Sequence, residues 1–129
     1  MRIEHAAIWT RDLEGLREFY ERYLGGRAGE RYVNESKGFA SYFLEFDGDT
    51  RLELMSMASI PDTRNEPLEQ FTGLVHVAFS LGSPAAVDEL GARLARDGFP
   101  LLDGPRRTGD GYYEATVLDP DGNRIELTA

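Results

Sequence analysis

The chain repeats one short pattern: Ile3-Glu4-His5-Ala6-Ala7, near the start of the sequence, returns as Leu74-Val75-His76-Val77-Ala78. A second pair of segments repeats in the same way, Leu52-Glu53-Leu54 and Ile125-Glu126-Leu127. The two His are 71 residues apart, the two Glu are 73 residues apart, and the chain has no other His. Self-similarity at a nearly constant spacing indicates a duplicated structural unit. A His at one end of each copy and a Glu at the other is typical of a duplicated metal-binding module.

The first copy has the pattern of a strand, a helix and three more strands. Side chains alternate between two faces over 2–9, which predicts a strand. Apolar side chains then recur at helical spacing from Leu13 to Leu24, after a candidate N-cap at Asp12 and before a stop at Gly25-Gly26. Short strand candidates follow at 28–33, 38–46 and 50–55.

The second copy repeats this order. A strand is expected over 74–81, and Ser83-Pro84 is a favourable start for a helix that stops at Gly98. Three more strands are expected near 100–106, 112–118 and 123–128.

We therefore expect one α+β domain over 1–129, built from two tandem βαβββ modules, 1–55 and 74–129. The intervening residues 56–73 contain Pro61 and Pro67, show no strong period, and are interpreted as a linker, a lid or both.

The alternation within strands predicts which face carries the repeated polar residues. Glu53 and Glu126 point away from the apolar neighbours on either side of them. His76 points away from the bulky apolar set of its own strand, which places it on the face of Glu126. His5 shares its face with Trp9, so it is placed only by its equivalence to His76.

An isolated His in an apolar strand is most often structural, but four such residues at equivalent repeat positions favour a metal site. Two neutral imidazoles and two carboxylates balance the charge of a divalent cation. This donor set suits Zn, Ni, Co, Fe or Mn. We expect His5, Glu53, His76 and Glu126 to bind one such ion.

The composition limits the partners. A net charge of −9 argues against nucleic acid and anionic membranes, because both need Lys- and Arg-rich surfaces. No apolar run approaches the length that crosses a membrane, and there is no Cys. The first residues lead directly into a strand pattern rather than a signal peptide. These features fit a cytoplasmic protein that binds neither nucleic acid nor membranes, and the acidic charge mildly favours a cationic ligand or a metal.

At this point the chain resembles the vicinal oxygen chelate superfamily, the group of glyoxalases, bleomycin-resistance proteins and extradiol dioxygenases. The resemblance covers essentially the whole chain. It rests on the Ile3-Glu4-His5 opening, the helix from Asp12 to Leu24, the strand from Leu74 to Phe79, and the closing Asp119-Pro120-Asp121-Gly122-Asn123-Arg124-Ile125-Glu126-Leu127. It implies paired βαβββ modules whose mixed sheet curls into a cup around a metal, with the helices outside.

The resemblance also separates subgroups by their metal ligands. Dioxygenases of the group typically bind iron through two His and one Glu, and bleomycin-binding members have typically lost the ligands. Bacterial metal-dependent glyoxalase I uses His, Glu, His and Glu, which His5, Glu53, His76 and Glu126 match one for one. Glyoxalase I also has an Arg four residues after the first His that binds a glutathione carboxylate. Trp9 stands there instead and cannot form that bidentate pair.

The leading hypothesis is therefore a glyoxalase-like lyase or isomerase whose substrate chelates the metal through adjacent oxygens and reacts through an enediolate. Either Glu126 or Glu53 would move the proton. The alternative is a binding protein that sequesters a drug or natural product, for which an aromatic, acidic cavity would suit a cationic aromatic ligand. An extradiol-type dioxygenase is disfavoured, because Glu53 would fill a position that oxygen or substrate needs.

Five further residues are candidates for contact with the substrate. Trp9 is either an aromatic wall beside His5 or core, and Tyr42 either lines the cup or is core. Tyr112, Glu114 and Thr116 share a strand face that is too polar for core and faces either cavity or solvent. We also expect a homodimer, because the sheets have exposed edges and because the resemblance implies that two chains pair, as superfamily members commonly do.

Overall fold

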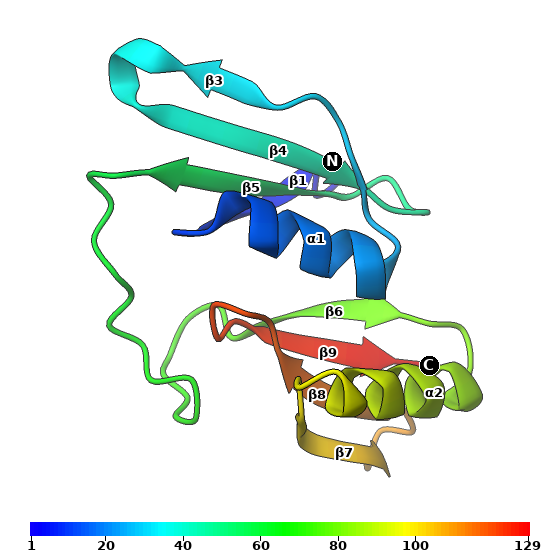
Figure 1. Ribbon diagram of the computed structural model, residues 1–129. Coiled ribbons are helices and arrows are strands. Elements are labelled where there is room, and N and C mark those ends of the chain that lie inside the picture. Colours follow the sequence, from blue (N-terminus) through cyan, green and yellow to red (C-terminus); the bar gives the residue numbers. More distant parts are fainter. The chain divides into compact units, whose positions relative to one another are not determined.

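Two units make up the chain, Met1–Thr63 and Arg64–Ala129, and each contains one helix and one mixed sheet (Figure 1). The computed structural model describes every residue from Met1 to Ala129. The expected α+β fold with two tandem modules is confirmed. The strands belong to two open sheets, one in each unit, rather than to one continuous sheet.

The first unit follows the expected order with one difference. Its elements are β1 (His5–Trp9), α1 (Leu13–Leu24), β2 (Arg27–Ala28), β3 (Tyr32–Asn34), a turn of 3₁₀ helix (Glu35–Lys37), β4 (Phe39–Glu45) and β5 (Arg51–Met57). The sheet order is β1-β5-β4-β2, with β1 parallel to β5. The single strand expected at 28–33 is instead two short strands, β2 and β3, which both pair with β4. β1 also begins at His5, later than expected.

The second unit repeats this topology. Its elements are β6 (His76–Ser80), α2 (Pro84–Arg96), β7 (Leu101–Arg107), β8 (Tyr113–Leu118) and β9 (Arg124–Thr128). The sheet order is β6-β9-β8-β7, and β6 runs parallel to β9 as β1 does to β5. The sequence repeat is therefore also a repeat of strand pairing.

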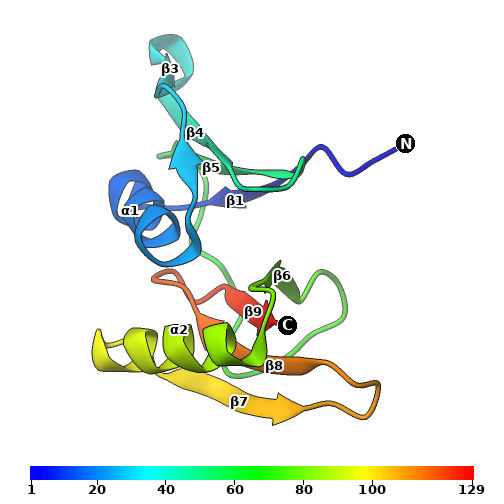
Figure 2. The same cartoon turned by 90° about the vertical axis from the view of Figure 1, so that its right-hand side faces the viewer.

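In each unit the helix covers one face of its sheet (Figure 2). Asp12 begins α1 by accepting a hydrogen bond from the backbone N–H of Gly15 at 2.9 Å, and Gly25 ends it in the left-handed conformation at φ 70°. Ser83 caps α2 in the same way. The buried side chains of the helices and sheets form the core: Leu16, Phe19, Tyr20, Leu44, Leu52 and Leu54 in one unit, and Val87, Leu94, Val117, Ile125 and Leu127 in the other.

This core decides which way the repeated Glu residues point. Leu52 and Leu54 on β5 are buried, so Glu53 between them faces away from α1. Ile125 and Leu127 do the same for Glu126 on β9. Neither helix is both long enough and apolar enough to cross a membrane.

The Asp119–Asn123 segment forms the turn that leads into β9. The carboxylate of Asp119 is buried and accepts hydrogen bonds from the backbone N–H groups of Asp121 (3.0 Å) and Asn123 (2.8 Å). Gly122 takes a left-handed φ of 83°, which disfavours a residue with a side chain. This turn is thus structural. It sets where β9 begins and so fixes the position of Glu126 on that strand.

Candidate functional site

The first half of the candidate site is a His–Glu pair on the face of the first sheet that α1 leaves uncovered. In the parallel pairing of β1 with β5, His5 lies opposite Arg51 and Ala7 lies opposite Glu53. His5 and Glu53 therefore share a face as diagonal neighbours. Nε2 of His5 lies 3.8 Å from Oε2 of Glu53, with side chains 39% and 15% exposed. The placement of His5 by equivalence alone is confirmed.

The second unit contains the equivalent pair. In the pairing of β6 with β9, His76 lies opposite Arg124 and Ala78 lies opposite Glu126. Nε2 of His76 lies 3.7 Å from Oε2 of Glu126, with side chains 40% and 20% exposed. The two pairs thus agree in strand register, in the atoms that face each other and in exposure.

The spacing and chemistry of each pair suit a shared metal ion. The separations of 3.8 Å and 3.7 Å are too long for hydrogen bonds. A His nitrogen and a carboxylate oxygen bound to one Zn²⁺ each lie about 2.0–2.2 Å from it, so they can be no more than about 4.3 Å apart. Both pairs fall within that limit. The structure brings the four candidate ligands into two pairs, and no group of three or more His, Asp or Glu is assembled for a metal.

The His5 ring has further neighbours that the sequence did not single out. Its Nδ1 is hydrogen-bonded to the carboxylate of Glu4, which also accepts a hydrogen bond from Arg51. Phe43 meets the ring edge-on, with centroids 5.4 Å apart, and the Arg51 guanidinium lies 4.3 Å from the Phe43 centroid. The hydrogen bond from His5, followed by that from Arg51, lowers the pKa of Glu4. The sequence did carry a signal for Arg51, because Arg51-Leu52-Glu53 repeats as Arg124-Ile125-Glu126.

The second pair has polar neighbours on β8, which include two of the candidate substrate-contact residues. Thr116 stands directly opposite Glu126 in the antiparallel pairing of β8 with β9, and Glu114 stands opposite Thr128. Nη2 of Arg106 lies 3.5 Å from Oε1 of Glu114. This face therefore presents a hydroxyl, carboxylates and a guanidinium around Glu126.

The aromatic candidates Trp9 and Tyr112 lie in different surroundings. Trp9 lies on the His5 face of β1, is 40% exposed, and meets Phe39 edge-on with centroids 6.0 Å apart. Phe39 in turn contacts Tyr32, also at 6.0 Å, which gives a row of three rings. Tyr112 is exposed and belongs to the turn before β8, where its backbone N–H donates to Thr108.

Tyr42 lies on the other face, the side that α1 covers, which agrees with the second of its two interpretations rather than with a place on the ligand side. Its Cα partner on β5 is the buried Leu54, so its side chain points toward α1. There its hydroxyl donates to Glu14 at 3.0 Å, and the guanidinium of Arg17 lies 5.5 Å from its ring centroid. Burial, and then the bond to Glu14, raise the pKa of Tyr42.

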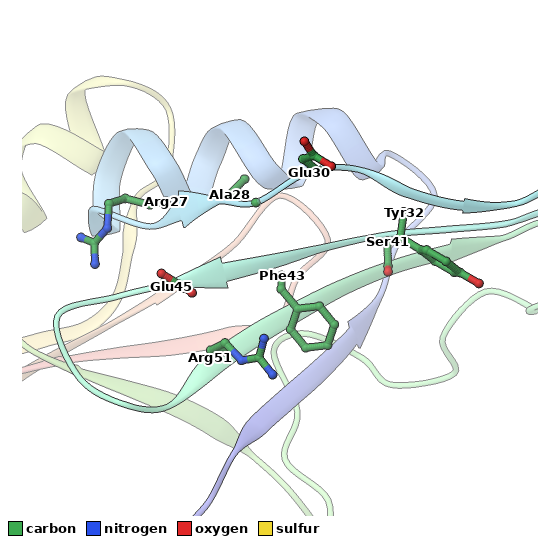
Figure 3. Close-up of a pocket in the computed structure, with 9 residues that line it drawn as sticks. Arg27, Ala28, Glu30, Tyr32, Ser41, Phe43, Glu45 and Arg51 are labelled. Atoms are coloured by element: carbon green, nitrogen blue, oxygen red, sulfur yellow. The ribbon is translucent and has the colours of Figure 1, made fainter.

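A hollow of about 380 Å³ opens on the first unit (Figure 3). Phe43 and Arg51, which contact the His5 environment, form part of its wall. The full lining is Arg27, Ala28, Gly29, Glu30, Tyr32, Ser41, Phe43, Glu45 and Arg51. The space is large enough for part of a small molecule and offers it charges of both signs.

A family model matches residues 2–127, almost the whole chain. The chain belongs to the Glyoxalase/Bleomycin resistance protein/Dioxygenase superfamily. The uncharacterized protein YqjT of Bacillus subtilis (strain 168) is 28% identical to this chain, and the match covers 98% of each of the two chains. Among solved structures, the trypanothione-dependent glyoxalase I of Leishmania major is 25% identical, with a TM-score of 0.78 over 98% of this chain and 85% of that one. A possible glyoxalase from Bacillus cereus is 27% identical, with a TM-score of 0.72 over 100% and 99%. Members of this superfamily thus share both modules with the present chain.

Proposed function

We propose that this superfamily member is a metal-dependent lyase or isomerase of the glyoxalase type. The observation that carries the proposal is the duplicated pair: a His Nε2 and a Glu Oε2 face each other at nearly equal distances in both units. His5, Glu53, His76 and Glu126 would hold one divalent ion from the group Zn, Ni, Co, Fe and Mn. The likeness to glyoxalase I of Leishmania major supports the type of chemistry.

The substrate would be a small molecule with two adjacent oxygens, such as an α-hydroxycarbonyl or a hemithioacetal. The bound ion supplies Lewis acidity, which polarises the carbonyl and acidifies the neighbouring C–H. The carboxylate of Glu126 or Glu53 takes that proton and returns it to the adjacent carbon. Both carboxylates are suited to this role, because each is largely screened from water yet opens onto the uncovered sheet face.

The surrounding residues would set the substrate. Thr116 and Glu114 lie beside Glu126 and can hydrogen-bond a polar group, and Tyr112 is exposed nearby in the chain. Trp9 carries an exposed ring on the His5 face of β1, at the position where an Arg would be needed for the glutathione carboxylate. We therefore propose a substrate other than a glutathione adduct. We further propose that the protein acts as a homodimer in the cytoplasm.

Proton exchange tests the proposed chemistry directly. Metal-loaded protein is incubated in deuterium oxide with a panel of α-hydroxycarbonyls and hemithioacetals, and loss of the C–H signal is followed by proton NMR. The proposal expects exchange with at least one substrate in wild type. It expects the exchange to be lost in Glu126→Gln or in Glu53→Gln, whichever removes the base, while metal stays bound. Exchange that is absent across the panel, or equal in both variants and wild type, contradicts it.

One observation favours a second candidate, a protein that sequesters a cationic aromatic ligand. Trp9 and Tyr32 present exposed rings on either side of the half-buried Phe39, on a chain with a net charge of −9. Sequestration does not need the metal, so a ligand of this class would bind His5→Ala and His76→Ala as tightly as wild type. An enzyme would lose its substrate affinity in the same variants. Calorimetric titration of the three proteins separates the two functions.

A further inference from the structure

The two half-sites differ at the residue that precedes each His. Glu4 precedes His5 and bonds its Nδ1, whereas Val75 precedes His76 and has no polar atom on its side chain. The structure gives the Nδ1 of His76 no side-chain partner. Arg51 and Arg124 lie opposite the two His residues in the same register, while the residue opposite each Glu on the antiparallel neighbouring strand differs, Phe43 for Glu53 and Thr116 for Glu126. The Nδ1 atom of His5 therefore has a side-chain hydrogen-bond partner, and the Nδ1 atom of His76 has none.

The partners of Glu4 determine which nitrogen of His5 carries the proton. A carboxylate accepts hydrogen bonds and does not donate them, and the guanidinium of Arg51 keeps this one charged. The Nδ1 atom facing it must therefore be the donor. In a neutral imidazole the other nitrogen then has a free lone pair. That nitrogen is Nε2, the atom that faces Glu53.

We propose that Glu4 is a positioning residue, which with Arg51 fixes the His5 ring with Nδ1 protonated and the Nε2 lone pair directed toward Glu53. Phe43 also restricts this ring, through its edge-on contact. His76 has no equivalent of Glu4, so the His5–Glu53 pair is the more ordered half of the site. The consequence for metal binding rests on the function proposed above, but the control of the ring itself does not.

Such support strengthens a metal ligand. A carboxylate that accepts the second N–H of a ligating His fixes the tautomer and raises the basicity of the free nitrogen. Loss of a partner of this kind typically weakens metal affinity by about 10- to 100-fold. The effect of Glu4 should be of that size, and it should be absent for any change at Val75 that keeps an apolar side chain.

Two variants separate the role of Glu4 from a general effect on folding. Glu4→Val places before His5 the same residue type that precedes His76, where Val75 stands. Glu4→Gln removes the charge but keeps an oxygen that can accept a hydrogen bond from Nδ1. Two-bond proton–nitrogen NMR of the metal-free proteins at about pH 8, where imidazoles are ordinarily neutral, reports the tautomer of both His residues. His76 serves as the internal control in every spectrum.

The expected result is a protonated Nδ1 for His5 in wild type and Glu4→Gln, and a shift toward protonated Nε2 in Glu4→Val, with His76 unchanged. Calorimetric titration with Zn²⁺ should then show a Kd raised about 10- to 100-fold in Glu4→Val only. An unchanged His5 tautomer in Glu4→Val, or a protonated Nε2 in wild type, overturns the proposal. Tautomer control without any Zn²⁺ binding would instead overturn the proposed function and leave the role of Glu4 standing.

Discussion

The carboxylate of Asp119 accepts hydrogen bonds from both the backbone N–H (2.8 Å) and the side-chain amide (2.9 Å) of Asn123. A third bond comes from the backbone N–H of Asp121. Because the carboxylate is buried, its removal leaves these donors without a partner. We expect Asp119→Ala to lower the free energy of unfolding by about 2–4 kcal/mol, measured by urea denaturation. Asp121→Ala, whose side chain is exposed, is the control and should change it by less than about 0.5 kcal/mol. Equal effects in the two variants would contradict this assignment.

Tyr42 should ionise at a higher pH in the folded protein than in the unfolded one. Burial and the hydrogen bond to Glu14 raise its pKa, and the neutral phenol is the form that donates this bond. The stabilisation is fully present below the pKa of an unfolded tyrosine, about 10, and is lost as pH rises through the higher folded pKa. Subtracting the phenolate absorbance of Tyr42→Phe from that of wild type isolates this titration. A folded midpoint at or below that of the same protein in urea would be the opposite result.

The position of Tyr42 shows where the sequence stopped being informative. Helices were predictable because their ends are local: Asp12 caps α1 three residues from the N–H it binds, and Gly25 ends it. Tyr42 and Phe43 are adjacent aromatic residues, however, and only the register of β4 on β5 decides which of them faces the helix.

The candidate site also combines features that the sequence predicted with features that it did not. The repeat and the alternation of side chains predicted both His–Glu pairs, because each pair depends on a strand pattern that the sequence carries. The sequence did not predict that the strand expected at 28–33 is divided into β2 and β3, because a two-residue strand such as β2 is too short to show a period. The contact of Arg51 with Glu4 was also missed, because it depends on how β1 lies beside β5.

Trp9 should block the use of glutathione adducts. Trp9→Arg restores a guanidinium that can form a bidentate pair with a carboxylate, worth about 1.5–3 kcal/mol. We expect kcat/KM for the methylglyoxal–glutathione hemithioacetal to rise about 10- to 100-fold over wild type. Trp9→Leu removes the ring without adding the charge and should give no such gain. Efficient turnover of this adduct by wild type would show that Trp9 does not exclude glutathione.

The free edges of the sheets predict association. β1 and β6 lie at the ends of their sheets, and each pairs along one side only. Unpaired edges favour contact with a second chain. Light scattering at micromolar concentration should give about twice the chain mass of 14.4 kDa. The mass should be measured with and without a chelator, and a monomer with metal bound would refute the dimer.

Metal content is the measurement that tests the central claim most directly. Wild type, His5→Ala and His76→Ala are supplemented with Zn²⁺, dialysed, and analysed for bound metal beside their melting temperatures with and without chelator. The account predicts about one divalent ion per wild-type chain, a large loss of metal in both variants, and a lower melting temperature on chelation of wild type only. No bound ion in wild type, or metal retained in full without either His, would contradict it.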